Sequence, residues 1–179
     1  MLKKIVVIGP ESTGKSTLCQ QLAQHYSTSW CPEFAREYLL ANGTNYKFSD
    51  LLKIAKGQID LEEKYTTKAI KHSSQFLFID TDMTVLKVWS EFVFNKCSSW
   101  ILKQANVRKY DLYLLCKNDL PWIADELREY PDLKTRDRLF LIYKNMMETQ
   151  TTPWVLIEGD SDKRLEIAIA ALDKLSIKR

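Results

Sequence analysis

The sequence has no long run of apolar residues. Its first apolar stretch covers only Ile5–Ile8, and no stretch approaches the roughly 18 apolar residues that cross a membrane. A secretory signal peptide also needs a longer apolar segment near the start of the chain than this one. We therefore expect neither a membrane partner nor a signal peptide.

The sequence also has few histidines, no metal-binding cysteine pattern and little net charge. The two histidines lie far apart, and the four cysteines form no CxxC pair. Such cysteines are typical of reduced, packed thiols in a cytoplasmic protein. The formal net charge of +3 is too small to indicate a nucleic-acid partner, and no feature indicates a partner protein. The four thiols are those of Cys19, Cys31, Cys97 and Cys116.

Short apolar runs alternate with helical patterns along the chain, and this order predicts an α/β fold with a parallel sheet. The runs contain no alternating polar residues, so we expect helices on both faces of the sheet, in a three-layer sandwich. A length of 179 residues suits one domain, residues 1–179. The five expected strands are Lys4–Ile8, Ser29–Pro32, Phe76–Asp80, Leu112–Cys116 and Trp154–Glu158.

Helical spacing and end signals predict helices between these strands. One follows the first strand, a second ends at Asn42-Gly43, and a third is capped by Ser49 and runs to about Lys71. A fourth covers Thr84–Asn95, and Ser161 is expected to cap the last. In contrast, Lys117–Arg138 is rich in charge, has two prolines and shows weak periodicity. We expect it to form a mobile lid over the edge of the sheet.

The loop after the first strand carries the most specific motif. Residues 9–16 read GPESTGKS and match GxxxxGK[ST], with a strand before and a helix after. Glycines let such a loop curl so that successive N–H groups point at phosphate oxygens, and the helix dipole adds to the attraction. Lys15 is expected to neutralise the β- and γ-phosphates, and Ser16 to ligate Mg²⁺. The other residues expected at this nucleotide site are Gly9, Glu11, Ser12, Thr13 and Gly14.

Three tests separate the classes of P-loop protein. Met83 stands where the DxxG of a GTP-binding switch needs glycine, and Cys116 replaces the base-contacting asparagine of NKxD. Thr81 follows Asp80, where hydrolytic motors usually carry a glutamate. These tests favour phosphoryl transfer to a second small molecule. A regulatory nucleotide-binding module and an ATPase are the alternatives.

Three carboxylates are candidates for the chemistry. Asp80 ends a strand and can reach Mg²⁺ through water, and Asp82 can hold the hydroxyl of the acceptor, although both can instead cap the next helix. Glu33 ends another strand on the side where open α/β sheets bind ligands. It can orient a sugar 5′-hydroxyl, or can be a surface cap paired with Arg36. Which of Glu33 and Asp82 takes the proton stays open.

The lid segment and the last loop add further candidates. Arg128, Arg136 and Arg138 can close over the transferred phosphate, or can pair with neighbouring acids at the surface. Trp122 is either a lid anchor or a stacking surface for a flat ring. The last loop is expected to pass the adenine base, or to be explained by packing alone; its residues are Gly159 and Asp160.

Five segments, in this order, resemble the NadR-type nicotinamide riboside kinase domain: GPESTGKSTL, PEFAREYL, FIDTDMT, LPWIADELR and IEGDSDKR. The resemblance covers nearly the whole chain, from about Lys3 to the final helix. It implies the fold of nucleoside and nucleotide monophosphate kinases, with a five-stranded parallel sheet and a lid. It also implies transfer of the γ-phosphate of ATP to the ribose 5′-hydroxyl of nicotinamide riboside, which gives nicotinamide mononucleotide for NAD synthesis.

The resemblance implies roles for individual residues, and this chain departs from the family in its lid motif. It implies that the cationic pyridinium ring stacks on Trp122. The lid motif of the family usually reads close to Asp-Asp-Gly-Leu-Arg, whereas residues 124–128 of this chain read Ala-Asp-Glu-Leu-Arg. This difference concerns substrate recognition, and a different nucleoside is the alternative acceptor. The adenylyltransferase and DNA-binding modules of the family are not expected within 179 residues. The implied ligands are phosphates at Gly14, Lys15, Ser16 and Thr17, Mg²⁺ at Ser16 and Asp80, and ribose at Glu33, Arg36 and Asp82.

Overall fold

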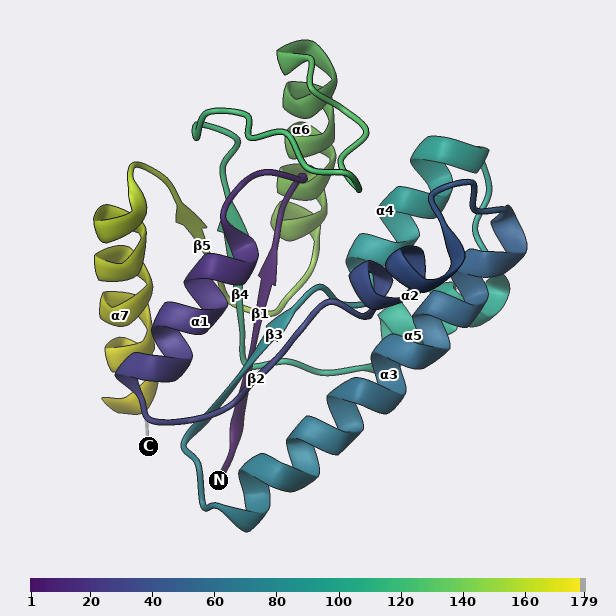
Figure 1. Cartoon of the computed structure of the whole chain (residues 1–179). Helices are drawn as coiled ribbons and strands as arrows, with labels where there is room; N and C mark the ends of the chain where they lie inside the picture. Colours follow the sequence, from purple (N-terminus) through teal and green to yellow (C-terminus); the bar gives the residue numbers. More distant parts are fainter. Residues whose placement is uncertain (178–179) are drawn as a thin grey trace.

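The computed structural model describes residues 1–177 and contains one five-stranded sheet (Figure 1). All neighbouring strands are parallel, in the order β2-β3-β1-β4-β5. The predicted α/β fold with a parallel sheet is therefore confirmed. The strands are β1 (Lys3–Ile8), β2 (Trp30–Cys31), β3 (Phe76–Asp80), β4 (Leu112–Cys116) and β5 (Trp154–Ile157).

Helices cover both faces of the sheet, as the unbroken apolar strands predict. Helices α1 and α7 lie on one face, whereas α4, α6 and the end of α3 pack on the other (Figure 1). None of the helices within residues 1–177 is long and apolar enough to span a membrane. The helices are α1 (Lys15–His25), α2 (Phe34–Asn42), α3 (Phe48–Lys71), α4 (Met83–Phe94), α5 (Ser99–Val107), α6 (Leu133–Thr149) and α7 (Ser161–Ile177).

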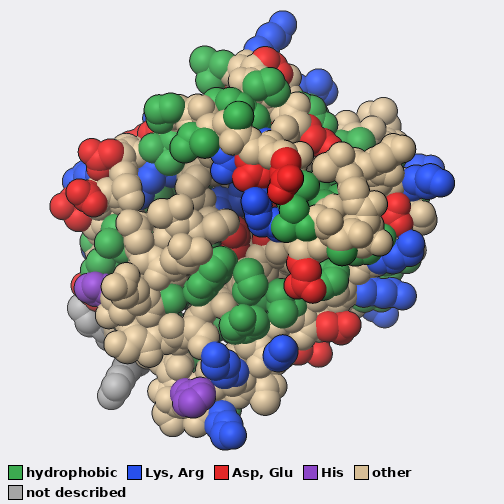
Figure 2. Space-filling model, viewed as in Figure 1, with side chains coloured by type: hydrophobic (Ala, Val, Ile, Leu, Met, Phe, Trp, Pro, Cys, Tyr) green, Lys and Arg blue, Asp and Glu red, His purple; other side chains and the backbone are tan. Residues whose placement is uncertain are grey.

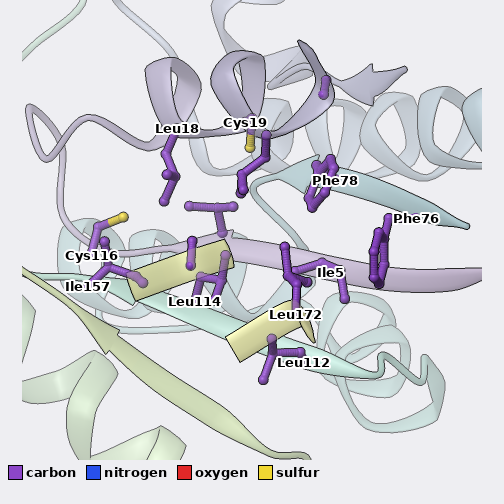
Figure 3. Packing of buried hydrophobic residues seen from close by; sticks show 14 residues of the cluster. Ile5, Leu18, Cys19, Phe76, Phe78, Leu112, Leu114, Cys116, Ile157 and Leu172 are labelled. Atoms are coloured by element: carbon purple, nitrogen blue, oxygen red, sulfur yellow. The ribbon is translucent and has the colours of Figure 1, made fainter. Parts of the chain in front are cut away.

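The core has two parts because successive strand residues point to opposite faces of the sheet. In β1, Ile5 and Val7 contact the α1 and α7 side, while Val6 and Ile8 contact the other side. Figure 3 shows the first part, where Phe76 and Phe78 extend it along β3. A third apolar cluster joins α2, α3, α4 and α5 beside the sheet. Packed apolar side chains therefore surround the strands, and the loops at the carboxyl ends of the strands start from this core.

Some helix ends differ from the prediction because other side chains reach the free amides. Helix α3 begins after Lys47, whose N–H donates to Asp50 (2.8 Å), so Ser49 is not its cap. At α7, the Asp160 carboxylate accepts from Lys163 N (2.9 Å) one residue before the predicted cap, Ser161. The end of α2 at Gly43 is confirmed, since this residue adopts φ 83°.

The predicted lid segment is shorter than expected. Residues 117–132, here called the β4–α6 connection, carry no helix or strand, but α6 begins at Leu133. Asp132 caps α6 by accepting from Thr135 N (2.8 Å). The first turn of α6 is highly charged, so the buried residues at helical spacing behind it were not recognised as a helix in the sequence. These residues, which the sequence reasoning missed together with α5, are Arg136, Leu139, Tyr143 and Met147.

Candidate active site

The loop between β1 and α1 has the backbone that its glycines predict. Gly9 and Gly14 have φ values of 141° and 75°, which disfavour any residue with a Cβ atom. A Cβ on Gly9 would lie 2.5 Å from the carbonyl oxygen of Cys116, so this glycine is also required by close packing. The loop therefore curls around the N-terminus of α1, which is an anion-binding geometry.

Lys15, Ser16 and Asp80 come together at the base of this loop. Lys15 Nζ donates to the carbonyl oxygen of Pro10 (2.8 Å), and Ser16 Oγ donates to Asp80 Oδ2 (2.5 Å). The other Asp80 oxygen, Oδ1, is buried and has no hydrogen-bond partner within residues 1–177. Burial raises the pKa of Asp80, whereas Lys15 and the Ser16 hydroxyl lower it. A hydroxyl and a carboxylate oxygen without a partner are hard ligands, so this pair fits Mg²⁺.

A cavity of about 460 Å³ extends from this loop toward α2 and α4. Its size is within the range of small-molecule sites. Figure 2 shows the upper part of this face hollowed, with charged side chains of both signs around the hollow. Residues of the β1–α1 loop and of the first turn of α1 line the cavity, including Glu11, Ser12, Thr13 and Thr17. Five aromatic residues, here called the aromatic wall, also line it: Trp30, Trp89, Phe92, Tyr130 and Tyr143.

Glu33 also lines this cavity. It precedes α2, but within residues 1–177 its side chain makes no cap hydrogen bond to that helix. Burial and the negative charge of Asp80 raise the pKa of Glu33 to about 7, although Lys15 and the Thr81 hydroxyl lower it. A carboxylate with a pKa near neutrality can accept a proton at physiological pH.

Asp82 lies only two residues beyond Asp80 but in a different environment. Its carboxylate accepts from Thr84 N (2.9 Å), Val85 N (3.3 Å) and the hydroxyl of Tyr113 (2.8 Å). Asp82 is 1% exposed and is not among the residues that line the cavity. The capping alternative therefore describes this side chain, and Glu33 is the carboxylate that faces the site.

The predicted arginines are divided between the cavity and the protein interior. Arg128 lines the cavity and donates to Ser12 Oγ (3.3 Å). Arg136 belongs to α6, is buried, and donates to the carbonyl oxygens of Ser12 (3.5 Å) and Leu120 (3.3 Å). Arg138 instead stacks on Phe92, 5.4 Å from the ring centre.

Trp122 is an anchor of the β4–α6 connection in this structure. Its ring lies 5.9 Å from the Arg128 guanidinium carbon and 5.4 Å from that of Arg136. It is not among the residues that line the cavity, whereas the members of the aromatic wall are. Arg36 lines the cavity, but both of its terminal nitrogens donate to Asp125 (3.1 and 3.2 Å).

The loop after β5 is held from inside by an arginine that the sequence reasoning missed. Arg164 is 3% exposed and donates to the carbonyl oxygens of Thr13 (3.0 Å), Lys117 (2.9 Å) and Gly159 (2.7 Å). It also pairs with Asp119. Neither Gly159 nor Asp160 lines the cavity. An arginine in the first turn of a helix carries no local signal of burial, because its partners lie on other loops.

The aromatic wall was also missed, although part of it had a signal. Trp89 and Phe92 fall within a predicted helix and lie three residues apart, so they share one face of that helix. Trp89 Nε1 donates to the hydroxyl of Tyr46 (2.8 Å), which fixes its ring at the cavity. Trp30 and Tyr143 come from distant elements, and only the fold brings them to the same site.

Comparison with known proteins places the chain among P-loop proteins. A family model described as an AAA domain matches residues 4–164. The chain is 27% identical over 168 residues to the trifunctional NAD biosynthesis/regulator protein NadR of Escherichia coli (strain K12), and equally to NadR of Salmonella typhimurium (strain LT2). These alignments cover 91% of this chain but 40% of each NadR, so the chain spans less than half the length of these curated relatives. The resemblance to the NadR-type domain is confirmed.

Solved structures confirm the predicted fold class. A NadR protein in complex with NR has a TM-score of 0.80 at 22% identity, over 99% of this chain and 52% of that chain. A NadR protein in complex with NAD and AMP-PNP has a TM-score of 0.73 at 22% identity, over 99% of this chain and 50% of that chain. The thymidylate kinase from Ehrlichia chaffeensis has a TM-score of 0.63 at 13% identity, over 97% and 98% of the two chains.

Proposed function

The chain belongs to the AAA domain family, and on this premise we propose that it is a kinase of NAD metabolism. The proposed reaction transfers the γ-phosphate of ATP to the ribose 5′-hydroxyl of nicotinamide riboside and gives nicotinamide mononucleotide. The identity of 27% to the NadR proteins supports this acceptor. We propose that residues 1–179 form one kinase domain. We also propose a cytoplasmic location.

One observation carries the proposal: residues suited to bind a phosphate donor and residues suited to bind an acceptor line the same cavity. Lys15 and Ser16 suit the donor, whereas Glu33 and the aromatic wall suit the acceptor, and all of them line this cavity. An ATPase needs no second pocket of this kind. A flat cationic ring gains attraction from aromatic faces, so the aromatic wall suits a pyridinium nucleoside.

On the donor side, the loop amides and Lys15 are proposed to bind the ATP phosphates. Lys15 Nζ exchanges the carbonyl oxygen of Pro10 for phosphate oxygens, which lie at the N-terminus of α1. Ser16 and Asp80 would hold Mg²⁺, which supplies neutralisation of the phosphate charge. Asp80 Oδ1 then gains the partner that it lacks among the described residues.

On the acceptor side, Glu33 is proposed to accept a hydrogen bond from the 5′-hydroxyl and then its proton. Phosphoryl transfer passes through a loose transition state, so the main effect of Glu33 is orientation of the hydroxyl. Arg128 is proposed to offset the negative charge on the moving phosphoryl group, because its guanidinium lies beside the phosphate loop. Arg36, which lines the cavity and pairs with Asp125, is proposed to contact the ribose.

The proposal is tested by incubating the purified chain with ATP and Mg²⁺ and a panel of nucleosides. We expect nicotinamide mononucleotide to form over many turnovers, detected by mass spectrometry. The Lys15→Ala variant should lose turnover and keep the circular dichroism spectrum of the wild type. Preference for another nucleoside would replace the proposed acceptor. Phosphate release without any acceptor would indicate an ATPase, and a fully active Lys15→Ala variant would overturn the role of the loop.

A further inference from the structure

The phosphate loop contains one acidic side chain, Glu11, whose charge opposes the binding of a nucleotide. Within residues 9–16 it is the only acid, and it lines the cavity. A carboxylate near the phosphates of ATP repels them, and partial burial strengthens the repulsion because water screens it less. The presence of Glu11 in this loop therefore needs a separate explanation.

The explanation lies in the contacts of Glu11 with the β4–α6 connection. Glu11 Oε2 accepts from Glu129 N (3.1 Å), and Oε1 accepts from Tyr130 N (2.5 Å). These two amides are successive in the chain and lie more than 100 residues from Glu11. Two backbone N–H groups that converge on one carboxylate form a charge-assisted contact, which is stronger than a neutral one. Both oxygens of Glu11 are thus used to hold the connection.

Ser12, the next residue of the loop, holds the same segment. Its hydroxyl oxygen accepts from Ile123 N (3.2 Å) and from Arg128 Nη1 (3.3 Å). Arg128, the proposed partner of the moving phosphoryl group, is therefore held by the phosphate loop as well as by Ile123 O and the Trp122 ring of its own segment. The connection has no helix or strand of its own to fix this arginine.

The connection also contacts the acceptor side of the cavity. Asp125 pairs with Arg36 of α2, and Glu129 accepts from the hydroxyl of Tyr46 (3.0 Å). Glu129 is thus held from both sides, by its amide at the phosphate loop and by its carboxylate at Tyr46. The segment therefore bridges the two halves of the cavity.

We propose that Glu11 is a positioning residue, which holds the β4–α6 connection against the phosphate loop and thereby places Arg128 for phosphoryl transfer. This inference rests on the kinase activity proposed above. Without the Glu11 carboxylate, the amides of Glu129 and Tyr130 turn to water, and the connection leaves the loop more often. Arg128 is then less often in place when charge moves, and of the aromatic wall only Tyr130 belongs to the segment that moves.

The test compares Glu11→Ala, Glu11→Gln and a charge-matched control, Glu126→Gln, in the full chain. Glu126 is exposed and lies in the same connection. Glu11→Ala removes two hydrogen bonds to a charged group, so we expect kcat to fall about tenfold or more. The KM for nicotinamide riboside should rise by a smaller factor than kcat falls, because Tyr130 belongs to the connection, whereas Trp89, Phe92 and Tyr143 line the cavity from helices. Glu11→Gln, which keeps one acceptor oxygen, should be intermediate, and the control should match the wild type.

Hydrogen–deuterium exchange gives a readout that does not depend on activity. In the nucleotide-free protein, the peptide that contains Glu129 and Tyr130 should exchange faster in Glu11→Ala than in the wild type and the control. If the wild type phosphorylates no nucleoside, the proposed function fails, and this exchange experiment still tests the contact. Unchanged exchange in Glu11→Ala, or a kcat equal to or above that of the wild type, would overturn the role of Glu11.

Discussion

Replacing Glu33 with glutamine should stabilise the folded protein at high pH and reduce its activity. Burial and the neighbouring Asp80 charge raise the pKa of Glu33 to about 7, from 4.5. A raised pKa contributes stability that is complete below the unfolded value and is lost as pH rises through the folded value. Above pH 7, ionised Glu33 therefore destabilises the fold, and glutamine removes this cost.

The size of the effect follows from the distance between the two pKa values. Each pKa unit corresponds to about 1.4 kcal/mol, so the values of 4.5 and about 7 give roughly 3 kcal/mol. The charge of Asp80 raises the pKa of Glu33 and that of Lys15 lowers it, so part of this free energy depends on these two neighbours. We expect Glu33→Gln to unfold with a free energy about 1 to 3 kcal/mol higher than the wild type at pH 8, and nearly equal at pH 4.5.

The measurement is urea unfolding at several pH values, without nucleotide and with a chelator present. Glu37→Gln is the control, because it removes an exposed acid from the same helix, α2. The kcat of Glu33→Gln should fall on the order of 100-fold if Glu33 orients and deprotonates the hydroxyl. A difference in stability that does not change between pH 4.5 and 8 would refute the reasoning.

Three further variants probe other parts of the molecule. Glu62→Gln breaks a buried ion pair with Lys4 and Arg108 (2.9 Å each) and should lower the free energy of unfolding by about 3 kcal/mol at pH 7. The pKa of Glu62 is lowered, so the loss should shrink as pH falls below about 4.5; a constant difference would contradict this. Gly9→Ala places a Cβ 2.5 Å from the carbonyl oxygen of Cys116 and therefore strains the phosphate loop. We expect calorimetry to show ATP binding weakened at least about tenfold, and an unchanged affinity would contradict this reasoning. Trp89→Leu should raise the KM for nicotinamide riboside about tenfold with little change in that for ATP, and equal effects on both would argue against the aromatic wall as the acceptor site.

The sheet and the phosphate loop were predictable because their signals are local. The strands are unbroken apolar runs, and β3 and β4 have the predicted bounds. The glycines of the loop are needed for the backbone at their own positions. Helix α6 was missed because its first turn is highly charged, and burial of its opposite face depends on the sheet.

Roles that depend on distant partners were decided by the tertiary structure. Asp82 and Glu33 look equally available in the sequence, but Tyr113 and the amides of α4 occupy Asp82, while Glu33 opens into the cavity. Glu11 belongs to a phosphate loop, yet its carboxylate holds amides more than 100 residues away.

The sequence by itself determined that this chain folds as a parallel α/β sheet with a phosphate loop after β1, because backbone conformation and strand burial follow from neighbouring residues. Only the tertiary structure decided which carboxylate lines the cavity, which aromatic rings line it and which arginine is buried. A side chain is free or occupied according to the groups that packing brings within hydrogen-bond distance, and those groups come from segments far apart in the chain.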